Sequence, residues 1–139
     1  MKKKSDISDR VVAFILTRDI DEFETLDVNS VAREFGINRS YLSQKFRMDM
    51  GSSLSDYILL VKILRSTTIL ERSKRITVGE IAVMMGFNSA NYFNRIFKKV
   101  LGTTPGRYRN YAEKLKKLKM LDKEGFERKL AEAEYDSMS

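Results

Sequence analysis

Two stretches of the chain carry nearly the same order of apolar and polar positions. They are LDVNSVAREFGI, residues 26–37, and ITVGEIAVMMGF, residues 76–87. The similarity continues beyond them with one extra residue in the second copy, so the chain repeats one supersecondary unit. The matched pairs are Val28 and Val78, Val31 and Ile81, Ala32 and Ala82, Gly36 and Gly86, and then Leu42 and Phe93, Phe46 and Phe97, and Tyr57 and Tyr108.

Each unit has the pattern of a helix, a short turn and a second helix. Thr77 and Glu80 form a T-x-x-E capping box, which predicts a helix that begins near Val78. Asp27 is placed to cap the matching helix of the first unit. A glycine ends each of these helices, as expected where the backbone turns left-handed. The second helices are expected to bury Leu42, Phe46, Phe93, Phe97 and Val100.

Helical spacing also predicts the elements around the units. A long helix over about 54–72 lacks Gly and Pro and would be about 28 Å long. An earlier helix is expected over about 8–18, and Pro105 is placed to start a short final helix that carries Tyr108 inward. The apolar positions are Val11, Val12, Ile15 and Leu16 in the first of these, and Leu54, Ile58, Val61, Leu64 and Leu70 in the long helix.

The tail, residues 112–139, has mixed charge and two apolar groups separated by Gly125. Its first half is amphipathic and is expected to extend the last helix, whereas its end is expected to fray. A docking helix for a partner and a solvated extension are both compatible with this pattern, and we favour the solvated extension. The apolar positions are Leu115, Leu118, Leu121, Phe126 and Leu130.

The amino-acid composition excludes several classes of chemical site. The 139 residues include neither Cys nor His, which excludes disulfides, Cys/His zinc sites and catalysis by thiolate or imidazole. The carboxylates do not cluster, so we expect no enzyme, no metal and no cofactor. No apolar run reaches the ~20 residues that cross a bilayer, so no membrane partner is expected. The lack of cysteine is compatible with a reducing cytoplasm.

Charge is concentrated in the repeated part of the chain. Residues 1–27 have a net charge of −2, residues 28–111 of +9, and residues 112–139 of zero. A basic block between an acidic segment and a neutral one indicates a polyanionic partner for that block. The Lys2–Lys4 run is either a linker remnant or a further phosphate contact.

The polar faces of the second helices carry side chains that suit base edges. Arg can bind guanine O6 and N7, and Asn or Gln can pair with adenine, whereas Ser reaches a base edge or a phosphate. Any helix of a soluble protein has a polar face, but these two follow a turn in duplicated units and lack acids until Asp49. The base-contact candidates are Arg39, Ser40, Ser43 and Gln44 in the first unit and Ala90, Asn91, Asn94 and Arg95 in the second.

Basic residues and helix N-termini beside these faces are expected to contact phosphates, which fixes position without selecting sequence. These candidates are Asn38, Arg47, Ser89, Lys98, Lys99, Arg107 and Arg109.

The second unit resembles the signature of the AraC/XylS family of bacterial transcription regulators. The family pattern contains I-A, G-F, S-x-x-Y-F-x-R-x-F-K-K and G-x-T-P-x-x-Y-R in this order. The matching residues are Ile81-Ala82, Gly86-Phe87, Ser89, Tyr92-Phe93, Arg95, Phe97-Lys98-Lys99, Gly102, Thr104-Pro105 and Tyr108-Arg109.

The resemblance covers about residues 8–111 and implies an all-α domain of seven helices. In it, helix-turn-helix units over about 27–48 and 77–101 are joined by the linker helix over about 54–72, and the second helix of each unit enters the major groove. The residues listed above as base-contact candidates are also those that the resemblance implies. Ser40 and Ser43 are short, so the first helix is expected to supply mostly phosphate contacts or only weak base discrimination.

The expected function is therefore sequence-specific binding of double-stranded DNA by a bacterial transcription regulator in the cytoplasm, at the nucleoid. The chain is either an excised DNA-binding domain or a small stand-alone regulator. RNA polymerase is a candidate partner, and no small-molecule ligand is expected. The alternatives are a helical protein–protein adaptor that binds nucleic acid non-specifically and an RNA-binding protein. RNA recognition usually uses exposed aromatic side chains, and here the aromatics fall on expected core positions.

Overall fold

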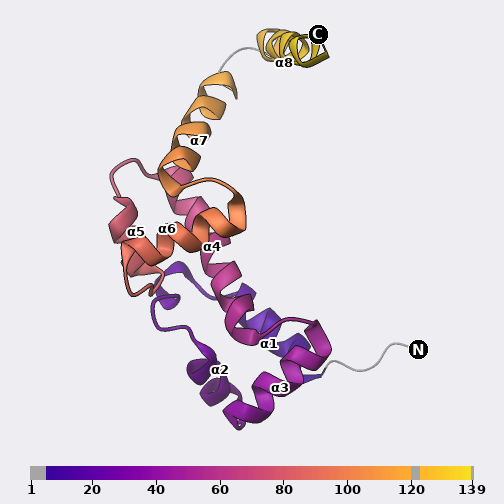
Figure 1. Ribbon diagram of the computed structural model, residues 1–139, viewed down its shortest axis with the longest axis vertical. Helices are drawn as coiled ribbons and strands as arrows, with labels where there is room; N and C mark the ends of the chain where they lie inside the picture. The colour runs from indigo at the N-terminus through magenta and orange to yellow at the C-terminus, as the bar shows by residue number, and fades with distance from the viewer. Residues whose placement is uncertain (1–5, 120–122, 139) are drawn as a thin grey trace, which may run out of the picture.

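A computed structural model of the chain describes residues 6–119 and 123–138, which form helices and connecting loops without a strand. The Lys2–Lys4 run and Leu121 lie outside this part of the chain. Figure 1 shows an elongated arrangement in which the two helix-turn-helix units lie along one long helix. The elements are α1 Ile7–Leu16, the 3₁₀ helix η1 Ile20–Glu22, α2 Val28–Phe35, α3 Arg39–Met50, α4 Leu54–Arg72, α5 Val78–Met84, α6 Ala90–Leu101, α7 Pro105–Lys119 and α8 Lys123–Met138.

The helix starts that the sequence predicted are confirmed. The Asp27 side chain accepts a hydrogen bond from the Ser30 amide (2.8 Å) at the start of α2. At the start of α5, Thr77 Oγ1 accepts from the Glu80 amide (3.0 Å), and Glu80 Oε1 accepts from the Thr77 amide (2.8 Å). These bonds satisfy amides that the first turn of a helix leaves without partners.

The repeat is visible as a pair of matching aromatic contacts. Phe46 of α3 packs on Tyr57 of α4 with ring centroids 5.6 Å apart. Phe97 of α6 packs on Tyr108 of α7 with ring centroids 5.8 Å apart. Each contact joins the second helix of a unit to the helix that follows it, so α7 occupies, after the second unit, the place that α4 occupies after the first.

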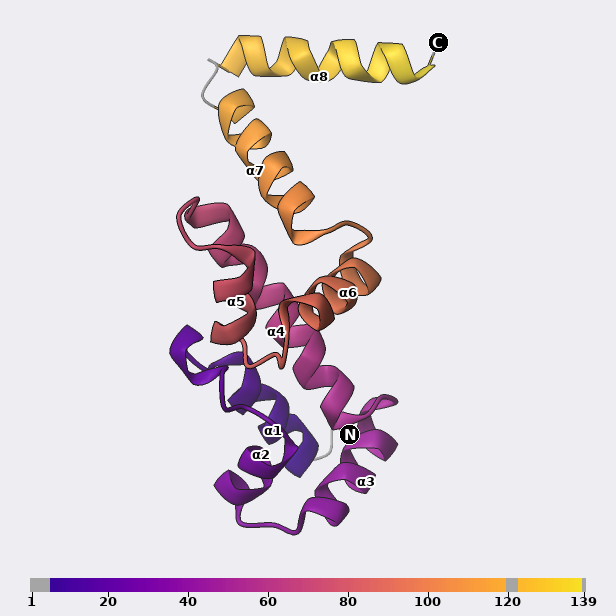
Figure 2. The same ribbon diagram turned by 60° about the vertical axis from the view of Figure 1, so that its left-hand side comes forward.

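Helix α4 connects the two units. It packs against all six of the helices α1–α3 and α5–α7. Both views show α3 near the first residues of α4 and α6 farther along it (Figures 1 and 2). Its buried apolar residues, which belong to one continuous core, are Leu54, Ile58, Val61, Ile63, Ile69 and Leu70.

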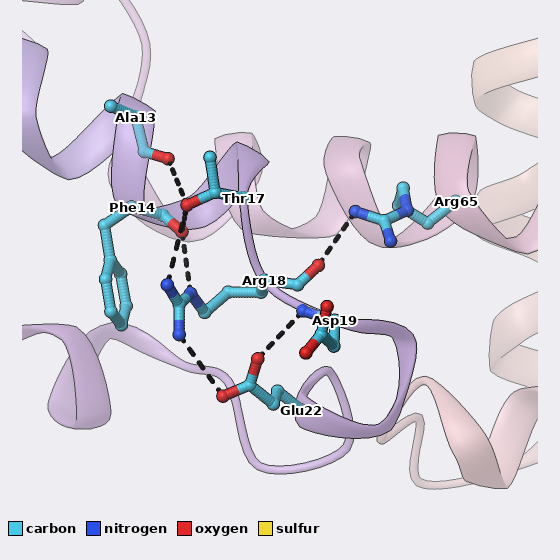
Figure 3. Close-up of polar contacts among 7 residues, drawn as sticks. All are labelled: Ala13, Phe14, Thr17, Arg18, Asp19, Glu22 and Arg65. Carbon is cyan, nitrogen blue, oxygen red and sulfur yellow. Dashed lines mark hydrogen bonds and ion pairs between the residues drawn. The ribbon is translucent and has the colours of Figure 1, made fainter.

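A polar corner attaches the end of α1 to the middle of α4, as Figure 3 shows. The Arg65 guanidinium of α4 donates to the carbonyl oxygen of Arg18 (3.0 Å) and lies over the ring of Phe23, 4.9 Å from its centroid. Arg18 in turn pairs with Glu22 (3.2 Å). The loop between α1 and α2 is thereby held against the linker helix.

Three details of the expected packing were wrong. Leu16, Leu64 and Val100 are 53%, 48% and 37% exposed instead of buried. At the end of α6, Leu101 packs against the core instead of Val100. The expected extension of the last helix into the tail is confirmed, since α7 continues from Pro105 to Lys119.

The two units meet at Gly86, in the turn of the second unit. A β-carbon placed on Gly86 would lie 2.2 Å from the carbonyl oxygen of Glu24 and 3.1 Å from Lys62 Nζ. The backbone of the second unit therefore touches the loop that precedes the first unit, with the buried Lys62 beside the contact. Burial lowers the pKa of Lys62, and the charge of Asp27 opposes that shift.

Substitution of Gly86 by alanine should cost much more stability than the same change at Gly36. Both residues have positive φ, 79° and 64°, but a β-carbon on Gly36 meets nothing within 4 Å. We expect the free energy of unfolding to fall by about 1–2 kcal/mol for Gly36→Ala and by about 3 kcal/mol or more for Gly86→Ala. Urea denaturation of the two variants measures this difference, and equal losses would contradict the close approach at Gly86.

A buried hydroxyl joins α1 to α3. Ser8 is fully buried, and its Oγ donates to Asp49 Oδ2 (2.7 Å). Lys45 pairs with the same carboxylate (3.1 Å). The Ser8 hydrogen bond, followed by the Lys45 contact, holds the pKa of Asp49 below its ordinary value of 3.8.

We expect Ser8→Ala to lower the melting temperature at neutral pH, and the loss should shrink in strong acid. A carboxyl group whose pKa is lower in the folded state stabilises the fold above its unfolded pKa. That contribution disappears as the pH falls through the folded pKa, which lies below 3.8. Thermal denaturation followed by circular dichroism from pH 7 down to strong acid tests this, with Ser55→Ala on the exposed side of α4 as control. A loss independent of pH would mean that only packing was removed.

Candidate nucleic-acid interface

The base-contact candidates of the first unit form one surface on α3. Leu42 and Phe46 anchor the opposite side of the helix in the core. The outward side chains line a single shallow depression, in which Ser43 is half-buried and the others are exposed. The structure thus brings together five residues predicted for base or phosphate contact. This α3 surface consists of Arg39, Ser40, Ser43, Gln44 and Arg47.

The matching surface of the second unit lies on α6, opposite the buried Phe93 and Phe97. Its exposed members include Arg95, whose guanidinium lies over the ring of Tyr92, 5.3 Å from the centroid. This contact positions the guanidinium without neutralising its charge. The α6 surface consists of Ala90, Asn91, Asn94, Arg95 and Lys98, of which all but Asn94 are exposed.

Asn94 differs from the other members of the α6 surface. It is half-buried, and its Oδ1 is buried without a hydrogen-bond partner among the described residues. A paired contact with adenine needs the amide oxygen and the amide nitrogen together. The side chain would therefore have to rotate before it could make such a contact.

Asn38 and Ser89 cap the helices α3 and α6. Asn38 Oδ1 accepts from the Tyr41 amide (3.1 Å), and Ser89 Oγ accepts from the Tyr92 amide (3.0 Å). Each cap satisfies the third amide of its helix and leaves the two amides before it pointing out of the helix end. Such a helix N-terminus attracts an anion, because the amide donors and the helix dipole act together.

The remaining phosphate candidates divide into two kinds. Lys98, Lys99 and Arg107 are exposed. Arg109 instead holds the end of α4 in place: its Nη2 donates to the carbonyl of Ile76 (2.6 Å) and its Nε to that of Leu70 (3.4 Å). The guanidinium of Arg109 therefore stabilises the fold by binding two backbone carbonyl groups.

The cations of both surfaces are not neutralised within the protein. Among residues 6–119 and 123–138, none of the arginines and lysines of the two surfaces takes part in an ion pair. The nearest acid along α3, Asp49, is engaged by Ser8 and Lys45. Both surfaces therefore present positive charge to a polyanion.

Two residues beside the α3 surface did not stand out in the sequence. Arg33 is exposed at the end of α2 and lines a depression with Arg39, so it adds to the positive charge there. Its only signal in the sequence is its charge just before the turn glycine. Tyr41 is 55% exposed next to the same surface, so the expectation that the aromatics occupy core positions was wrong for this residue.

One group of carboxylates in the described part of the chain could meet a cation. The side chains of Asp19, Asp21 and Glu22 are exposed and have oxygens within 4.8 Å of one another. Glu22 already pairs with Arg18 and accepts from the Asp19 amide (2.8 Å). These bonds explain why the three carboxylates lie together: they belong to the cap of the 3₁₀ helix η1.

Comparison with known proteins places this architecture in a family. A sequence profile described as "Helix-turn-helix domain" matches residues 31–111, which is more than half of the chain. The chain is 30% identical over 94 residues to the "Probable transcription factor PqrA" of Proteus vulgaris, with 68% of this chain and 76% of that protein aligned. None of the described helices is both long and apolar enough to cross a membrane.

Two further similarities extend this result. The "Msm operon regulatory protein" of Streptococcus mutans is 35% identical over 85 residues, which are 61% of this chain and 30% of that protein. The chain thus corresponds to less than a third of that relative. Among solved structures, the DNA-binding domain of AdpA in complex with a target DNA superimposes with a TM-score of 0.63 at 29% identity, covering 77% of this chain and 93% of that one.

The buried oxygen of Asn94 predicts an unusual response to truncation. An unsatisfied buried acceptor costs about 1–3 kcal/mol, so Asn94→Ala should leave the free energy of unfolding unchanged or raise it by up to about 1 kcal/mol. Asn91→Ala, on the exposed face of the same helix, should change it by less than about 0.5 kcal/mol. Urea denaturation compares the two. A loss above about 1 kcal/mol for Asn94→Ala would show that its oxygen has a partner.

Proposed function

We propose that this chain, which belongs to the AraC/XylS family of transcription regulators, binds double-stranded DNA by placing α3 and α6 in two successive segments of the major groove. The observation that carries the proposal is the pair of polar, acid-free surfaces on the second helices of two repeated units. Both are held by one continuous helix, α4.

The two surfaces differ, so the DNA site should be asymmetric. The α3 surface offers Gln44 and Arg39 with two short serines between them. The α6 surface offers Arg95 and Asn91 beside Ala90, which can contact only an apolar group such as a thymine methyl. A single chain would then recognise two different half-sites in a fixed order.

The spacing along α4 of the contacts that attach the two units favours bent DNA. The aromatic contact of α3 reaches α4 at Tyr57, whereas the α6–α7 contact reaches α4 at Glu71, which accepts from the Tyr108 hydroxyl. These points are about 21 Å apart along the α4 axis at 1.5 Å per residue. Successive major-groove segments on one face of straight DNA are about 34 Å apart. Bending closes such a gap at a cost of about 1–6 kcal/mol.

Phosphate contacts would surround the base contacts. The free amides after the caps Asn38 and Ser89 and the exposed side chains of Arg47, Lys98, Lys99 and Arg107 are the groups that we propose for this task. Arg109 is not needed, because its guanidinium is bound within the fold. Each phosphate contact would release counterions and make the affinity depend on salt.

The wider role follows from the family. We propose a bacterial transcription regulator that acts at the nucleoid in the cytoplasm, with RNA polymerase as a protein partner and without a small-molecule ligand bound by this part of the chain. The proposal covers activation and repression alike, because both begin with occupation of a DNA site. An adaptor without sequence specificity would not need two repeated units with unlike polar faces.

The first experiment is selection of binding sites from a random duplex pool at two salt concentrations. We expect enrichment of an asymmetric site with two half-elements about 10 bp apart. Binding that weakens with salt and enriches no sequence would contradict specific recognition by this chain alone.

Comparing Arg95→Ala on the selected site and on random DNA should separate the contribution of base contacts to affinity from that of charge. Loss of one good bidentate contact, about 1–3 kcal/mol, should weaken binding to the selected site about 5- to 150-fold and binding to random DNA much less. Lys99→Ala should weaken both equally and reduce the salt slope by about 1. Arg128→Ala removes the same charge from α8 and serves as control. Equal losses on the two DNAs for Arg95→Ala, measured by fluorescence anisotropy, would exclude a base-contact role.

A further inference from the structure

The end of the chain forms a regular helix with little support from the rest of the molecule. Helix α8, Lys123–Met138, continues beyond α7 and lies apart from the other helices in both views (Figures 1 and 2). Its side chains from 127 to 136 are all exposed, including Leu130 at 49%. Most of the stability of a helix in a protein comes from tertiary contacts of one face rather than from intrinsic propensity. Such contacts are therefore expected from another surface.

Helix α7 presents an apolar groove that lacks a cover. Tyr111 and Leu115, one helical turn apart, are 59% and 53% exposed. With Tyr108 and Ala112 they line a groove of about 330 Å³. Its floor is fixed, because the Tyr108 hydroxyl and the Lys116 ammonium both donate to Glu71 of α4.

The repeat explains why this groove is open. Helix α7 follows the second unit as α4 follows the first, with matching aromatic contacts to the unit before it. Helix α4 is covered by a second unit, α5 and α6, whereas among the described residues α7 is followed by the single helix α8. The last element of a repeated structure exposes a surface that its predecessors bury, unless a capping element covers it.

The charges of α7 and α8 are complementary. From Arg107 to Lys119, α7 carries six basic side chains and one acidic one. From Leu130 to Asp136, α8 carries three acidic side chains and no basic one. Two copies of α7 would repel each other, and so would two copies of the end of α8, whereas α8 on α7 joins opposite charges around apolar contacts.

We infer that α8 of one copy packs in the α7 groove of a second copy of this chain, and that the second copy returns the same contact. Figure 2 shows α8 running across the end of its own α7 rather than back along it, so its own groove is left open to another molecule. The exchange is reciprocal and forms a closed two-fold dimer. Each dimer contains two such contacts, and each α8 is about 24 Å long.

This dimer does not rest on the DNA-binding proposal. The α7–α8 contact uses none of the residues of the α3 and α6 surfaces, and it can be measured without DNA. A protein that binds DNA as a monomer would contradict the inference and leave the proposed function intact.

Reversing charges on either side of the contact should weaken the dimer, and mixing the two variants should restore it. One variant carries Lys114→Glu and Lys119→Glu on α7, and the other carries Glu132→Lys and Asp136→Lys on α8. All four residues are exposed. At the substituted positions each variant carries the same sign of charge on α7 and α8, so dimerisation should weaken about tenfold or more. In an equimolar mixture, a dimer of one copy of each variant again has opposite charges at the substituted positions of both contacts, and the dimer should return.

Sedimentation velocity of the whole chain over a range of concentrations measures all four samples, and far-ultraviolet circular dichroism confirms that the variants keep their helix content. A dimeric wild type, monomeric variants and a dimeric mixture are the expected results. A monomeric wild type, dimers that persist in both variants, or a mixture that stays monomeric would each overturn the inference. The last result, with a dimeric wild type, would point to other contacts between copies.

Discussion

The position of every functional group in this protein depends on how α4 packs between the two helix-turn-helix units. This helix contacts each of α1–α3 and α5–α7, and its interior contains neither glycine nor proline, so it behaves as a single rigid rod. The ring contact of Phe46 with Tyr57 attaches α3 to it, and the hydrogen bond from Tyr108 to Glu71 attaches α7, on which Phe97 of α6 packs. The direct approach of Gly86 to Glu24 then fixes the angle between the units.

Much of this arrangement could be predicted from the sequence, because it depends on local rules. The capping box of Thr77 and Glu80 and the duplicated apolar positions gave the helices and their starts. The resemblance to the AraC/XylS family is confirmed by the profile match over residues 31–111. The all-α fold with two units on a long helix is also confirmed by the structure.

What could not be predicted depends on the neighbours of each side chain in space. Periodicity assigned Leu64 and Val100 to the core, but among the described residues their side chains remain 48% and 37% exposed. The charge of Arg109 suggested a phosphate contact, whereas its guanidinium binds two carbonyl oxygens of the linker region. In the same way, nothing in the spacing of Asn94 indicates that its amide oxygen is buried. The order of α8 was also unexpected, because its composition is typical of a solvated tail.

The close contact at Gly86 has a kinetic consequence. No side chain separates the turn of the second unit from the backbone near Glu24, so the units have no hinge at their junction. If α3 and α6 occupy two groove segments as proposed, a molecule of this kind would release both segments together. Its residence time on DNA should therefore be governed by a single escape event, in which all contacts are lost together.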